Sequence, residues 1–183
     1  MTVFNVLQPG TYAVDPTHTE IGFTARHMMV AKVRGSFPEY TADVVVGQTL
    51  ADSSVNVEVQ LNSVDTRNED RDNHLRTSDF FDIENHPTMT FRSTEITEDS
   101  MTGDLTIKGI TRPVTFDLEF VGVSPDPWGG TRAGFEANAD VHRKDWDLVW
   151  NVAVEGGGVL VSEKIKLHLD VELVVPADEA AQA

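Results

Sequence analysis

The sequence predicts an all-β fold in which antiparallel strands form a sandwich or a closed barrel. Apolar and polar residues alternate with a period of two, as in the "VTFDLEF" run of residues 114–120. Turn signals such as "SPDPWGG" and "EGGG" separate these runs, and no strand–helix alternation appears. Closing the sheet removes exposed edges, and about eight strands leave an interior that side chains fill or that holds one small ligand.

The alternating runs give the expected strands in chain order. They cover residues 19–27, 40–46, 54–61, 89–96, 101–108, 114–120, 134–142, 148–154 and 164–173. Each run has one apolar face, so the strands bury that face against a common interior.

A charged insert interrupts the strands at "RDNHLRTSDFFDIENHPTMTF", residues 71–91. Residues 68–76 are expected to form about two helical turns, with Asp65 or Thr66 as the cap. Phe80 and Phe81 are too apolar for an ordinary exposed loop. We therefore expect a short helical segment near residues 68–82 that covers one end of the barrel.

The composition and charge of the chain exclude several classes of partner and site. The chain has 183 residues and a net charge of −16, from 14 basic and 30 acidic residues, so it repels phosphate backbones and nucleic acid is not an expected partner. It has no cysteine, which excludes disulfides and thiolate sites. No apolar run reaches about 18 residues and the N-terminus has no signal-peptide pattern, so a cytoplasmic protein without stable membrane insertion is expected. Residues 1–175 are expected to form a single domain and 176–183 a flexible tail.

Several motifs in a fixed order resemble one known family, the YceI-like polyisoprenoid-binding proteins. They are "YAVDPTHTEIGFTARH" from Tyr12, Gly35-Ser36-Phe37, "RDNHLRTSDFFD", "GDLTIKGITRPV" from Gly103 and "HRKDWDL" from His142. The resemblance runs from about Tyr12 to Leu173, with Thr19 where serine is usual and Asp147 where glycine is common. It implies an eight-stranded lipocalin-like barrel that holds a long isoprenoid tail and has no catalytic apparatus.

The alternation and the resemblance together give a predicted pocket for the ligand tail. Burial of hydrocarbon contributes roughly 25 cal/mol per Å², so a long tail needs only apolar walls. From the pattern alone, a solid core explains the same residues better, and the resemblance is what favours a pocket. The predicted lining is Phe23, Ala25, Phe80, Phe81, Met89, Phe91, Leu105, Ile107, Phe116, Leu118, Phe135, Val141 and Trp146.

Basic side chains give a predicted head-group site. Residues 21–38 contain three cations and no acid, and the insert adds two arginines. A pyrophosphate head would favour such cations, whereas a quinone needs none, and a solvated hairpin tip explains them equally well. The predicted head-group residues are Arg26, His27, Lys32, Arg34, Arg71 and Arg76.

Metal, cofactor and catalytic patterns are weak. The six histidines form no ligand motif, so no metal and no cofactor are expected. Asp145 beside Trp146 resembles a general acid against a hydrophobic wall, but a turn-fixing aspartate and a tryptophan that plugs the barrel end explain the pair better.

The predicted function is therefore binding, not catalysis. The barrel is expected to sequester or carry a long-chain polyisoprenoid, either an isoprenoid pyrophosphate or an isoprenoid quinone. Two alternatives stay open, an enzyme acting on an isoprenoid or lipid substrate in the same cavity and a solid barrel used as an interaction surface. A homodimer is also left open.

Overall fold

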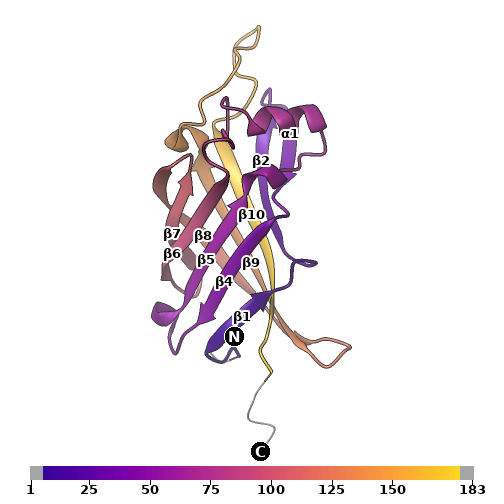
Figure 1. Cartoon of the computed structure of the whole chain (residues 1–183), viewed down its shortest axis with the longest axis vertical. Coiled ribbons are helices and arrows are strands. Elements are labelled where there is room, and N and C mark those ends of the chain that lie inside the picture. Colours follow the sequence, from indigo (N-terminus) through magenta and orange to yellow (C-terminus); the bar gives the residue numbers. More distant parts are fainter. Residues whose placement is uncertain (1–5, 178–183) are drawn as a thin grey trace, which may run out of the picture.

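A computed structural model describes residues 6–177 as one β-barrel with a short helix at one end (Figure 1). The strands are β1 (Gly10–Val14), β2 (Glu20–His27), β3 (Ala31–Ser36), β4 (Tyr40–Val46), β5 (Ser54–Gln60), β6 (Thr88–Ile96), β7 (Ser100–Ile107), β8 (Ile110–Pro125), β9 (Thr131–His142) and β10 (Lys164–Val174). The helix is α1 (Glu69–Arg76), and the 3-10 turns are η2 (Leu50–Asp52), η3 (Leu61–Ser63) and η4 (Arg143–Trp146).

Eight antiparallel strands close the barrel, as predicted. Their order is β1-β4-β5-β6-β7-β8-β9-β10, and β1 returns to pair with β10 through Ala13–Val174 and Val14–Leu173. The remaining two strands form a hairpin, β2–β3, on the same edge of β10, where residues 20–24 of β2 pair with residues 166–170 of β10. One edge of β10 is thus divided between β1 and β2.

The alternating pattern sets which side chains face the interior. On β10, Ile165, Leu169 and Leu173 point into the barrel, while Lys164 and Lys166 lie exposed on the outside. The inward set from Ile165 to Leu173 spans eight residue steps, which is about 26 Å at the usual rise of a strand. The interior is therefore long and narrow.

The helix forms near the predicted place but with a different cap. Asn68 is the N-cap, and its side-chain oxygen accepts a hydrogen bond from the backbone N–H of Arg71 at 2.9 Å. The prediction of Asp65 or Thr66 as cap is wrong, because both are used elsewhere. The Asp65 carboxylate accepts from the Arg67 N–H, and Thr66 donates its N–H and hydroxyl to buried Asp72.

The predicted strand at residues 148–154 is also wrong. Only one isolated bridge, Ala153–Val159, forms within this stretch. The Arg143 guanidinium takes the carbonyls of Leu148 and Trp150, at 2.6 and 2.9 Å, which a neighbouring strand would otherwise use. The alternating apolar residues of 148–154 therefore lie in a loop, and the Arg143 side chain holds that loop in place.

Two further boundaries differ from the sequence pattern. The list of expected strands lacked β1 and β3, whose five and six residues are too few for a clear alternation. Strand β8 is much longer than the predicted 114–120, because it continues through an irregularity at Phe120–Gly122 to Pro125.

The predicted tail at 176–183 lies outside the described residues from 178 onward, and the single-domain extent of 1–175 stays a prediction. No helix among residues 6–177 has the length and hydropathy to cross a bilayer.

Candidate ligand-binding cavity

An elongated cavity of about 310 Å³ occupies the barrel interior. Leu75 and Phe81 border it at the end covered by α1, and Leu7, Val46 and Leu50 border it toward the opposite end. Hydrocarbon side chains supply almost the whole wall. The interior is hollow, so the alternative of a solid barrel is wrong.

All thirteen residues predicted for the tail pocket border this cavity. They are Phe23, Ala25, Phe80, Phe81, Met89, Phe91, Leu105, Ile107, Phe116, Leu118, Phe135, Val141 and Trp146. Several of them, such as Phe23 and Leu118, point inward and are still half-buried. A side chain in a filled core would be fully buried, so this partial exposure marks the wall of a hollow. Contact between these residues and a ligand stays a prediction.

The insert between β5 and β6 covers one end of the cavity with aromatic rings. Phe80 is 6% exposed and packs against His74 and Trp150, with ring centroids 5.1 and 5.3 Å apart. Phe81 packs edge-to-face on Phe37 at 5.9 Å. These contacts hold the insert against both the projecting 149–160 loop and the segment after β3. We refer to residues 69–86 as the lid.

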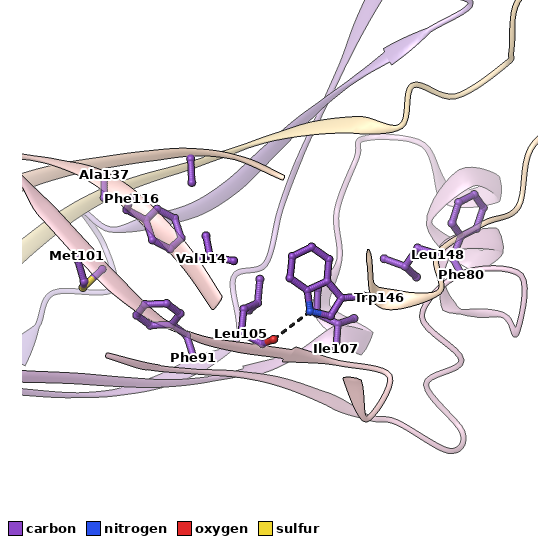
Figure 2. Packing of buried hydrophobic residues seen from close by; sticks show 11 residues of the cluster. Phe80, Phe91, Met101, Leu105, Ile107, Val114, Phe116, Ala137, Trp146 and Leu148 are labelled. Atoms are coloured by element: carbon purple, nitrogen blue, oxygen red, sulfur yellow. Dashed lines mark hydrogen bonds between the residues drawn. The ribbon is translucent and has the colours of Figure 1, made fainter. Parts of the chain in front are cut away.

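Trp146 closes the barrel beside the lid. Its side chain is 2% exposed, and its indole N–H donates to the Leu105 carbonyl at 2.9 Å (Figure 2). In Figure 2 it lies between Ile107 and Leu148, in line with the apolar side chains that follow the barrel interior. Asp145, by contrast, is exposed. The interpretation of Trp146 as a plug therefore fits the geometry, and a general acid at Asp145 does not.

The next residue, Asp147, adopts the left-handed conformation with φ 59°, which glycine adopts without strain. Its carbonyl accepts from the Lys108 ammonium at 3.2 Å. The departure at this position thus keeps the turn that the resemblance implied. The hydroxyl of Thr19 likewise serves where serine is usual, because it accepts the Glu172 N–H at 3.0 Å.

Arg143 is a cavity residue that the sequence analysis missed. It is 4% exposed, borders the cavity and donates to the carbonyls of Leu148, Trp150, Val161 and Ser162. Burial lowers the pKa of its guanidinium, and the nearby Glu163 opposes that shift. The signal was the lone arginine of "HRKDW", directly after an alternating strand.

None of the six predicted head-group residues borders the cavity. Arg26, His27, Lys32 and Arg34 are exposed on the β2–β3 hairpin. The lid arginines bind backbone instead. Arg71 donates to the Thr66 hydroxyl and carbonyl, at 2.7 and 2.6 Å, and Arg76 donates to the carbonyls of Asn62 and Val64. Recognition of a head group by these residues stays a prediction.

Few polar groups reach the cavity. Among the described residues that border it, there is no aspartate, glutamate or histidine. Tyr40 borders it, and its buried hydroxyl has no hydrogen-bond partner within the described part of the chain. Burial raises the pKa of Tyr40. A wall of this kind suits a hydrocarbon guest and offers no acid–base pair.

A cluster of possible metal ligands lies outside the cavity. One atom each from Asp15, His18 and Glu172 falls within 4.8 Å of the others. The Arg132 guanidinium is 3.9 Å from Asp15 and 3.7 Å from Glu172, so it already supplies a positive charge to both carboxylates. The cluster ties the start of β2 to β10 as an ion-pair network.

Known proteins share both sequence and fold with this chain. The model of the "YceI-like domain" family matches residues 12–173. UPF0312 protein SERP2314 of Staphylococcus epidermidis is 39% identical over 165 residues, covering 88% of this chain and 95% of its own length.

Two solved structures share the fold. A crystal structure of a Campylobacter jejuni YCEI protein has a TM-score of 0.68 and 29% identity, covering 83% of this chain and 90% of its own. A polyisoprenoid binding domain from Saccharophagus degradans has a TM-score of 0.67 and 13% identity, covering 92% of this chain and 100% of its own. Together with the family match, these comparisons show that the chain belongs to the YceI-like domain family.

Proposed function

We propose that the barrel binds a long-chain polyisoprenoid, an isoprenoid pyrophosphate or an isoprenoid quinone, and sequesters or carries it. The observation that carries the proposal is the cavity of about 310 Å³, which hydrocarbon side chains line along the barrel. Its volume is at the lower end of the range typical of ligand pockets, roughly 300–1,000 Å³. The inward-facing residues of β10 that border it span about 26 Å along the strand, which favours a linear chain over a compact ring system.

The energetics of the wall agree with a hydrocarbon guest. An apolar tail leaves no buried polar group unpaired in such a cavity, whereas a sugar or nucleotide would lose its hydrogen bonds to water. The polyisoprenoid binding domain from Saccharophagus degradans has the same fold. At 13% identity that likeness supports the architecture, and the ligand class for this chain is our proposal.

The position of charges bears on the head group. Arg143 is the cation that borders the cavity among the described residues, and its donors already serve four carbonyls. An anionic pyrophosphate therefore gains little inside the barrel, and we place it at the surface near Arg26 and Lys32. A quinone head, which is neutral, fits inside. Exchange of either ligand requires movement of the lid.

A second candidate, an enzyme acting on a lipid in the same cavity, needs groups that transfer protons. The described wall carries no carboxylate and no imidazole, so binding is the better supported function. A cytoplasmic location and a homodimer stay predictions.

The test is mass spectrometry of organic extracts from protein purified without detergent. A prenyl species is expected from the wild type. Ala137 is 3% exposed and faces the cavity in the middle of β9, so Ala137→Phe is expected to displace the lipid. The control is Glu136→Phe, which adds the same ring to the exposed face of the same strand. Recovery of no lipid from the wild type, or of equal lipid from both variants, would overturn the proposal.

A further inference from the structure

The turn between β2 and β3 exposes three apolar side chains. Met28 is 43%, Met29 59% and Val30 79% exposed, and we call residues 28–30 the hairpin tip. Single exposed apolar residues are common on protein surfaces, but three in succession at a convex tip are not required by any contact of the fold.

The backbone of the hairpin tip does not explain the methionines. Met28 and Met29 both adopt positive φ, 50° and 61°, in a tight turn closed by the Val30 N–H on the His27 carbonyl. Asn-Gly is the favoured pair for such a turn, and a bulky side chain there costs free energy. Methionine at positions 28 and 29 therefore costs free energy in two ways, through backbone strain and through exposure of an apolar side chain.

The charges beside the hairpin tip are equally unfavourable for folding alone. Arg26 and Lys32 lie directly opposite each other on β2 and β3, and like charges in that position destabilise a sheet. Arg34 follows on the same hairpin. Within residues 6–177 no ion pair neutralises any of these three cations, although the chain carries a net charge of −16.

A second apolar element projects beside the hairpin tip. The projecting loop, residues 149–160, exposes Val149 and Val152 by 53% and 48%. It is joined to the tip by a hydrogen bond from the Met28 N–H to the Leu160 carbonyl at 2.9 Å. Figure 1 shows this loop rising beyond the barrel at the same end as α1. Five of the eight exposed large apolar side chains among the described residues thus lie at the lid end.

We propose that the hairpin tip and the projecting loop dock onto the surface of an anionic lipid membrane. Methionine and valine side chains enter the boundary between headgroups and acyl chains, and Arg26, Lys32 and Arg34 meet the lipid phosphates. The projecting loop itself carries one exposed acid, Glu155, against the three cations of the hairpin, and acids farther than about 10 Å from the surface are screened at physiological salt. The acidic first turn of α1 lies at the same end, which tilts the barrel onto its hairpin side.

A second copy of this chain fits the same surface less well. Its acidic groups would pair with the cations, but apolar side chains at a convex tip need an apolar medium to enter. The docking stands on the hairpin and not on the ligand class. If the proposed function also holds, the lid faces the membrane from which a prenyl lipid would enter.

The test is cosedimentation with vesicles. Wild-type protein is expected to bind vesicles of phosphatidylglycerol mixed with phosphatidylcholine, and to bind phosphatidylcholine vesicles much less. The double variant Met28→Asn with Met29→Gly supplies the favoured turn, so its thermal unfolding temperature is expected to rise while vesicle binding falls roughly tenfold. Arg26→Gln with Lys32→Gln is expected to abolish the preference for anionic vesicles.

The matched control is Trp128→Asn. Trp128 is 88% exposed on the β8–β9 turn at the opposite end of the barrel, and its loss is expected to leave binding unchanged. Absence of wild-type binding, or equal binding by the turn variant, would overturn the proposal. A change in oligomeric state without vesicle binding would overturn it in favour of a second copy. Lipid extracted from the turn variant reports separately on the cavity, since the hairpin tip does not border it.

Discussion

The ring of Phe23 lies over Gly35, its partner on the neighbouring strand, inside the barrel. A Cβ atom added at Gly35 would come 2.3 Å from the Phe23 Cζ and 2.9 Å from the Thr66 methyl carbon. Glycine at this position therefore lets the phenylalanine lie flat beside the cavity wall. This contact gives a physical reason for the Gly35-Ser36-Phe37 motif.

Gly35→Ala tests that contact. The added methyl group is expected to push the Phe23 ring into the cavity, lowering the free energy of unfolding by about 1–3 kcal/mol and reducing bound lipid. Chemical denaturation and extraction of the same preparations measure the two effects. Gly134→Ala is the control, because an added Cβ at Gly134 comes no closer than 3.4 Å, to the Cβ of Val121, which is ordinary contact. Unchanged stability and lipid content in Gly35→Ala would contradict the packing argument.

Phe81 tests the role of the lid. It is half-buried and borders the cavity, so Phe81→Ala is expected to speed ligand release while costing less stability than Phe80→Ala. Phe80 is buried between two rings, and truncating a buried phenylalanine typically costs about 3–5 kcal/mol. Transfer of a fluorescent prenyl lipid to vesicles measures release. A release rate equal to that of the wild type would argue against exchange through the lid.

Arg143 holds the projecting loop, so its removal should loosen that loop. Arg143→Met leaves the carbonyls of Leu148, Trp150 and Ser162 without their donor, while that of Val161 keeps the Asn151 amide, and it is expected to lower the free energy of unfolding by about 2–4 kcal/mol. Arg143→Lys keeps the charge but not the planar fork, so it is expected to recover only part of that loss. Hydrogen exchange across residues 148–162 measures the local effect. Full rescue by lysine would show that charge, and not geometry, is what the site needs.

The buried hydroxyl of Tyr40 makes no hydrogen bond of good geometry among the described residues, although Thr19 lies beside it and partly offsets the effect of burial on its pKa. Tyr40→Phe removes the unpaired group and keeps the ring, so the free energy of unfolding is expected to stay equal or rise by about 1 kcal/mol. Thermal unfolding measures it. A marked loss of stability would mean that the hydroxyl binds a group inside the barrel, such as a ligand oxygen.

Asp126 makes the β8–β9 turn sensitive to acid. The Gly130 N–H is the main cause of its lowered pKa, and Trp128 and Arg132 add to the shift. A lowered folded pKa contributes stability above the unfolded value, near 3.8, and loses it as pH falls through the folded value. Asp126→Asn is therefore expected to lower the unfolding temperature at neutral pH, with a difference from the wild type that shrinks as the pH falls below 3.8. A constant difference at all pH values would contradict this account.

Alternation predicted a sandwich or a closed barrel with an apolar face, because a period of two assigns each side chain to a face without knowledge of partners. The resemblance was needed to choose a hollow barrel. Alternation placed Phe116 and Leu118 beside the cavity correctly. The same rule failed at residues 148–154, where Arg143, from outside the segment, takes the carbonyls of Leu148 and Trp150. Local pattern does not contain such a contact.

The cations of the candidate site show the same limit of sequence patterns. Charge clustering pointed to Arg71 and Arg76, but both are occupied by loop carbonyls close in sequence. Arg143, which does reach the interior, looked like an ordinary basic residue after a strand. Whether a cation is free or bound to backbone depends on the path of the chain, and composition does not report that path.

The pairing of β1 with β10 determines when the barrel can close during protein synthesis. Strand β1 pairs with β10, which is synthesised after all the other strands of the barrel, so the ring of strands stays open until residues 164–174 have been made. During that interval the apolar faces of β4 to β9 are exposed to solvent. We expect nascent chains that stall before Lys164 to engage chaperones, and full-length chains to be released from them.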